Sequence, residues 1–105
     1  MPGVDLNYFI RQASKLTEKI EERKKRLAEE TVEGKAGDGL VVVVVNGVQE
    51  LRSVAIDSRL LDPNEKALLE DTITAAVNAA LTQSREYMQK ELNKVTGGVK
   101  IPGLT

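Results

Sequence analysis

The chain contains no cysteine and no histidine among its 105 residues. It therefore cannot form disulfides, and it has no thiolate nucleophile, no imidazole general base and none of the common zinc ligand sets. Paired carboxylates, glycine-rich phosphate loops and serine-based catalytic arrangements do not stand out either. These absences predict a protein of the reducing cytoplasm that is not an enzyme and that binds no cofactor, metal or small-molecule substrate.

Aromatic residues and long apolar runs are also scarce. Tyr8, Phe9 and Tyr87 are the only aromatic residues, so the chain lacks a platform on which single-stranded bases could stack. The longest apolar run, residues 40–45, falls far short of the ~20 residues that span a bilayer. Residues 1–11 show no basic start followed by an apolar stretch. We therefore expect a soluble protein that is not exported and has no membrane contact.

A long helix is predicted from Asp5, a suitable N-cap, to about Glu30. Apolar residues recur there in steps of three and four, which forms a narrow stripe along one side of a helix. A helix with so narrow a stripe must lean on another helix for much of its length. The stripe consists of Leu6, Phe9, Ala13, Leu16, Ile20 and Leu27.

Three strands follow, at residues 31–36, 40–45 and 48–57, with a turn at 36–39. Asn46-Gly47 favours a two-residue type I′ hairpin between the last two strands. The second strand is nearly all valine, and because neighbouring residues point to opposite faces, both of its faces must be covered. Two helices are too few for this, so a second subunit is expected to cover the rest. The alternative is a centre strand that is covered within one subunit.

The second half of the chain predicts a helical turn at 58–61 and then a long helix. Asp62 caps its start, Pro63 lies in the first turn and Glu65 takes the capping-box position. Its alanine-rich middle, residues 74–81, permits close approach of a helix or sheet, and Gly97-Gly98 ends it. The tail, residues 97–105, is expected to fray. Residues 1–105 are thus predicted to form one α+β domain with a long N-terminal helix, a three-stranded antiparallel meander and a long C-terminal helix, assembled as a homodimer.

Charge is distributed unevenly, although the net charge is only −1. Residues 11–26 contain seven basic and three acidic residues. Most of the basic ones are four residues apart and so lie along one side of the helix, where they could follow a phosphate backbone. With two lysines of the second helix, the candidate contacts to duplex DNA are Arg11, Lys15, Lys19, Arg23, Arg26, Lys90 and Lys94.

Two other interpretations compete with DNA binding. The charged helix could simply be solvated and stabilised by i,i+4 pairs such as Glu21 with Lys25, and a pI near 5.5 is low for a DNA-binding domain. Alternatively, the helices could hold another protein, as in a coiled-coil adaptor or a prefoldin-like chaperone.

Three segments together resemble a known family. They are "EGKAGDGLVVVVVNG" at 33–47, "VAIDSRLLD" at 54–62 and the Gly/Pro tail "GGVKIPGL" at 97–104. The chain is similar in these to the YbaB/EbfC family of bacterial nucleoid-associated proteins. The resemblance implies a homodimer with a joined sheet core and helices that project like the arms of tweezers. It also implies binding to duplex DNA at the nucleoid, with an influence on chromosome organisation or gene expression.

Overall fold

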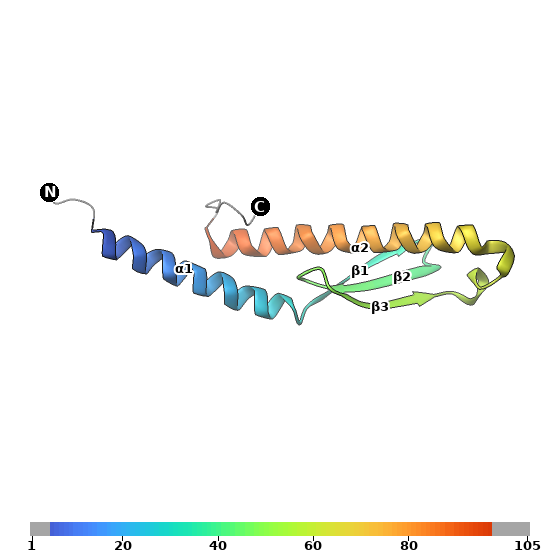
Figure 1. Ribbon diagram of the computed structural model, residues 1–105, viewed down its shortest axis with the longest axis horizontal. Helices are drawn as coiled ribbons and strands as arrows, with labels where there is room; N and C mark the ends of the chain where they lie inside the picture. The colour runs from blue at the N-terminus through green and yellow to red at the C-terminus, as the bar shows by residue number, and fades with distance from the viewer. Residues whose placement is uncertain (1–4, 98–105) are drawn as a thin grey trace.

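The computed structural model describes residues 5–97. It confirms the predicted fold class, with a helix, a three-stranded antiparallel sheet and a second long helix in that order (Figure 1). The elements are α1 (Leu6–Leu27), β1 (Thr31–Ala36), β2 (Val41–Asn46), β3 (Leu51–Ile56), two short 3-10 helices (Ser58–Leu60 and Pro63–Glu65) and α2 (Lys66–Val95).

Helix α2 is the spine of an elongated molecule that measures 76 × 20 × 16 Å. The sheet lies along its N-terminal half, and the C-terminal half of α1 packs against its other end (Figure 1). From Leu16 to Leu27 the apolar side of α1 is at least partly buried there. Residues 6–15 project past the end of α2 and are exposed. The support predicted for α1 is therefore confirmed for its C-terminal half only.

Both ends of α1 follow from local chemistry. The Asp5 carboxylate accepts hydrogen bonds from the N–H groups of Asn7 and Tyr8 at 3.0 and 3.3 Å, which confirms the predicted N-cap. The helix ends at Leu27, before the predicted Glu30. The N–H of Glu30 donates to the carbonyl of Leu27 at 3.1 Å, so the chain tightens into a turn instead of continuing the helix.

The core lies where the middle of α2 crosses β1 and β2. Val41, Val43 and Val45 are fully buried and pack against Ala76 and Ala80. The alanine-rich middle of α2 does permit the predicted close approach, and the residue that meets it on the sheet is Gly34. A Cβ at Gly34 would lie 2.3 Å from the backbone nitrogen of Ala80, so no larger residue fits without displacement of the helix.

The turn after β2 differs from the predicted type I′ hairpin. The positive φ falls on Gln49 (64°) and not on Gly47, and β3 begins only at Leu51. Gly47 is needed for another reason: its N–H donates to the Leu27 carbonyl at 2.9 Å, and a Cβ there would lie 2.7 Å from that oxygen. The Asn-Gly prediction was wrong because this turn docks against the end of α1, which overrides its local preference.

The two faces of the sheet are covered unequally. Helix α2 buries alternate valines of β2 completely, whereas Val42 and Val44, which point the other way, are only half-buried. All of β3 is exposed. Burial of the valine run is thus confirmed on the α2 side, and its covering by a second subunit stays a prediction.

The start of α2 contains an extra short element. Asp62 caps the 3-10 helix at Pro63–Glu65 by accepting from the N–H of Asn64 at 2.9 Å, and α2 itself begins at Lys66. The helical turn predicted at 58–61 is confirmed as the 3-10 helix Ser58–Leu60. Gly97 has a φ of +63°, the left-handed conformation expected after a helix end. The predicted fraying of the tail concerns residues that, after Gly97, lie outside the described ones.

Candidate nucleic-acid interface

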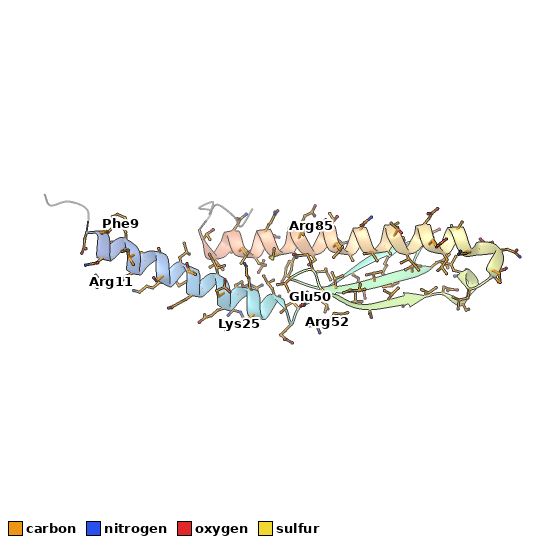
Figure 2. All side chains as sticks on the ribbon, viewed as in Figure 1. Phe9, Arg11, Lys25, Glu50, Arg52 and Arg85 are labelled. Carbon is orange, nitrogen blue, oxygen red and sulfur yellow. The ribbon has the colours of Figure 1, made fainter. Side chains whose placement is uncertain are left out.

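The projecting half of α1 carries positive charge only. Residues 6–15 include Arg11 and Lys15 and no acidic residue, and both basic side chains are exposed. Lys19 continues the series one turn later and is exposed as well. Each step of four residues turns about 40° past a full helical turn, so the series winds gradually around α1. Figure 2 shows Arg11 on the opposite side of α1 from Phe9.

Arg23, the next residue in the series, lies at the contact between α1 and α2. Its guanidinium donates to Glu30 at 2.6 Å and to Glu91 at 2.8 Å, and its side chain is only 13% exposed. The Tyr87 hydroxyl donates to the same Glu30 carboxylate. We call these four residues, Arg23, Glu30, Tyr87 and Glu91, the arm joint, because they tie α1, the turn after it and α2 together. Arg23 is therefore held by protein carboxylates instead of facing solvent.

The hydrogen bonds of the arm joint shift the pKa values of its members, so that Arg23, Glu30 and Glu91 are favoured as charged groups and Tyr87 as a neutral hydroxyl. Hydrogen bonds from Arg23, and then from Tyr87, lower the pKa of Glu30. Hydrogen bonds from Lys94 and Arg23 lower the pKa of Glu91. The pKa of Arg23 is raised by its hydrogen bonds to the two carboxylates, and the bond to Glu30 raises the pKa of the Tyr87 hydroxyl. Each shift favours the protonation state that the hydrogen bonds need.

The remaining candidate cations also include one that is paired with an acid and two that face solvent. Lys94 forms an ion pair with Glu91 at 2.7 Å, so it belongs to the surroundings of the arm joint although its side chain is 64% exposed. Arg26 and Lys90 are exposed and make no ion pair within residues 5–97. Five of the seven candidate cations are therefore exposed and form no ion pair with another residue in the range 5–97: Arg11, Lys15, Lys19, Arg26 and Lys90.

A second polar connection holds the end of α1 through Asn46, which is completely buried. Its side-chain amide donates to the Ala28 carbonyl at 3.1 Å and to the Glu50 carboxylate at 2.7 Å. Its backbone carbonyl accepts from the Ser84 hydroxyl of α2 at 2.6 Å. The sequence offered Asn46 only as a turn residue, because its partners Ala28 and Ser84 are 18 and 38 residues away along the chain.

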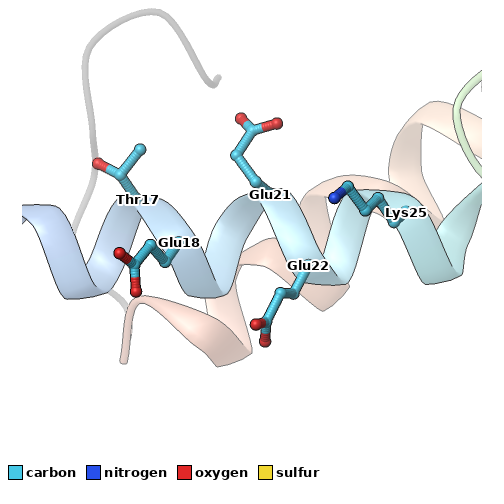
Figure 3. A pocket seen from close by; sticks show the side chains of 5 residues that line it. All are labelled: Thr17, Glu18, Glu21, Glu22 and Lys25. Atoms are coloured by element: carbon cyan, nitrogen blue, oxygen red, sulfur yellow. The ribbon is translucent and has the colours of Figure 1, made fainter.

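The outer side of α1 has a shallow hollow of about 280 Å³. Its lining side chains leave the helix on two sides and do not converge on a common point (Figure 3). They are Thr17, Glu18, Glu21, Glu22 and Lys25. This acid-rich stretch does not favour phosphate, so the positive part of the arm is its projecting half.

Residues 5–97 contain neither a candidate metal site nor a candidate membrane span. No group of acidic side chains there is arranged to hold a metal ion. No helix in the same range combines the length and the apolar character that crossing a membrane requires. The helices also do not pair along their length as in the prefoldin-like alternative, since α1 meets α2 only near Leu16–Leu27.

Comparisons of sequence and structure relate this chain to known proteins. The sequence profile of the YbaB/EbfC DNA-binding family matches residues 1–99. A nucleoid-associated protein of Myxococcus xanthus is 71% identical over 105 residues and is aligned over the full length of both chains. One from Anaeromyxobacter dehalogenans is 46% identical, covering 96% of this chain and 98% of its own.

A solved structure shows the same fold. The crystal structure of an uncharacterised protein from Helicobacter pylori superposes with a TM-score of 0.81 at 20% identity, covering 90% of this chain and all of that one. Family profile and relatives agree over nearly the whole length, and this family is defined by DNA binding and not by catalysis. The chain belongs to the YbaB/EbfC DNA-binding family.

Proposed function

We propose that this chain binds duplex DNA at the nucleoid as a homodimer, with little sequence specificity, and thereby influences nucleoid organisation or gene expression. The observation that carries the proposal is the projecting half of α1, which presents Arg11 and Lys15 to solvent and contains no acidic residue between positions 6 and 15. Lys19 extends this series toward the body of the molecule. Names of the relatives and of the family support DNA as the partner.

The proposed contacts are to phosphate. Lysine and arginine side chains on one exposed helix supply charge but no fixed geometry for reading base edges, so binding should be tolerant of sequence. Arg26 and Lys90 extend the positive surface toward the arm joint. Arg23 and Lys94 contribute less directly, because both are paired with Glu91.

The homodimer is supported by an uncovered apolar surface on β3. Val54 and Ile56 stand opposite the buried Val43 and Val41 in the sheet register, so they point to the face that α2 covers. They nevertheless remain 39% and 36% exposed. Leu51 on the same strand is 55% exposed. A second copy seated on this strip would bury it and would place two arms in one particle.

Salt dependence tests the DNA proposal. If a dimer neutralises about four to eight phosphates, the logarithm of affinity should fall with the logarithm of salt concentration at a slope of roughly −4 to −7. Replacing Lys15, Lys19 and Arg26 together with Gln should flatten the slope, because helix propensity is kept and charge is removed. A control that changes Lys35, Arg59 and Lys66 to Gln removes the same charge far from α1. Equal slopes in both variants would contradict the proposed surface.

Oligomeric mass tests the dimer independently. Light scattering should give about 23 kDa, twice the 11.5 kDa chain. Ile56→Asp should dissociate the dimer, because it would bury an unpaired charge in the interface. Ala55→Asp, on the opposite face of the same strand, is the matched control and should leave the dimer intact. A monomeric wild-type protein at micromolar concentration would refute the proposal.

A further inference from the structure

The apolar seam of α1 continues past the end of α2. From Leu16 to Leu27 this seam packs in one cluster with Val95, in the last turn of α2. Toward the N-terminus Phe9 and Leu6 prolong the same seam, yet they are 54% and 68% exposed. Figure 2 shows Phe9 beyond the end of α2, on the side of α1 that faces that helix. The seam thus becomes bare at the point where α2 stops.

Further large apolar side chains lie beside the bare seam. Tyr8 and Ile10 are 52% and 55% exposed, and the Tyr8 and Phe9 rings stand edge to face at 5.8 Å. Ala13 fills the seam position between Phe9 and Leu16 and is exposed as well. Grouped exposed apolar side chains of this kind mark a contact surface.

The chain itself supplies an apolar segment at the same place. Gly97, with its φ of +63°, ends α2 two residues after Val95, which already packs in the cluster that includes Leu16. Residues 98–105 follow, and they contain Val99, Ile101 and Leu104. We propose that residues 98–105 dock along the bare seam of α1 in the same chain and continue the cover that α2 provides.

The dimensions agree with this arrangement. Ten helical residues, from Leu16 to Leu6, span about 15 Å, whereas eight extended residues reach up to about 26 Å. If the segment is extended from Gly97, residue 99 would lie about 7 Å and residue 101 about 13 Å from Gly97, measured along the seam. Ala13 and Phe9 lie about 5 and 11 Å along it from Leu16. Residues 99 and 101 also share one face of an extended chain, so both can turn toward α1.

Charge disfavours the arm of a second copy as the occupant. Arg11 and Lys15 flank the bare seam without an acid in residues 6–15, so two paired arms would bring four like charges together. The segment 98–105 carries a single charged side chain, Lys100, and leaves the flanks of the arm free.

Disulfide trapping tests the docking directly, because the chain has no native cysteine. The double variant Ala13→Cys/Val99→Cys should oxidise to an intrachain disulfide. Ser14→Cys/Val99→Cys is the matched control: residue 14 is adjacent in sequence but turned about 100° around the helix. We expect about tenfold more intrachain product from the first pair. Equal yields would overturn the proposal, and so would a disulfide that forms mainly between chains in a mixture of ¹⁵N-labelled and unlabelled protein.

Hydrogen exchange provides a second readout that needs no introduced cysteine. Amides of residues 10–16 should exchange about tenfold faster in a chain that ends at Gly97 and in the variant Val99→Ser/Ile101→Ser, while amides of residues 72–84 stay unchanged. Unchanged exchange of residues 10–16 in both variants would overturn the docking. Protection of those amides only when duplex DNA is added would also overturn it and would make DNA the occupant. Both docking assays are run without DNA, so their outcome is separate from that of the proposed function.

Discussion

Gly34→Ala is the substitution with the sharpest consequence for the fold. A methyl group at Gly34 would lie 2.3 Å from the Ala80 nitrogen and 2.5 Å from the Ala76 carbonyl oxygen, both backbone atoms of α2. Ordinary contact begins at about 3.4 Å, so α2 would have to move by about 1 Å along a well-packed surface. Such overpacking typically costs about 1–3 kcal/mol. Backbone preference alone predicts the opposite effect on stability, because alanine in place of a glycine within a strand stabilises the fold by about 0.4–1 kcal/mol.

Urea unfolding followed by circular dichroism, at one fixed protein concentration, measures this change. The midpoint should fall, and in a thermal scan the Tm should drop by about 5–20 °C. Gly39→Ala is the comparison: its φ of +85° makes alanine strained, but no atom lies within 4 Å of the new methyl group, so the loss should be about 1 kcal/mol. If Gly34→Ala were as stable as the wild type, or lost less than Gly39→Ala, the reasoning about the helix–sheet contact would be refuted.

Two further predictions concern the arm joint. Arg23→Gln should lower the free energy of unfolding by about 1–2 kcal/mol, because Glu30 and Glu91 lose their shared donor. The salt dependence of DNA affinity should change less in this variant than in Lys19→Gln. If both variants flattened the salt dependence equally, Arg23 would be shown to contact phosphate. The pKa of Glu30 is lowered from its ordinary 4.5, so its ionised form stabilises the fold above that pH, and the contribution is lost as the pH falls through the lower folded-state value. The stability difference between Glu30→Gln and the wild type should therefore be largest near neutral pH and shrink below about pH 4, which urea titrations across pH can measure.

Local chemistry accounts for what the sequence predicted well. The Asp5 cap, the strand at 31–36 and the helical turn after Asp57 depend on neighbouring residues, and each is found as expected. The α2 contact at Gly34 and the docking of Gly47 on Leu27 depend on partners distant in the chain. No periodicity within one helix or strand contains that information, so the type I′ prediction failed where a tertiary contact decided the turn.

The same difference between local and distant contacts applies to the candidate interface. Spacing placed Arg23 in one series with Arg11, Lys15 and Lys19, because four-residue steps look alike along a helix. The series also winds around α1, and the carboxylates that hold Arg23 inward include Glu91, which is 68 residues away along the chain. The sequence therefore predicted the positive arm but could not separate the cations that face solvent from the one that holds the arm in place.

In the proposed DNA complex, the arm joint sets the position of the projecting half of α1. Arg11 lies twelve residues, about 18 Å, from Arg23 along the helix. A rotation of about 10° at the joint would move Arg11 by about 3 Å, close to the 3.4 Å rise between successive phosphates on one strand. Apolar contacts alone would allow α1 to slide along α2. The bonds of 2.6 and 2.8 Å from Arg23 to two separate carboxylates fix both the position and the direction of α1. In the proposed complex, therefore, the register of Arg11 and Lys15 on the phosphate backbone depends on an ion-pair network that itself makes no contact with DNA.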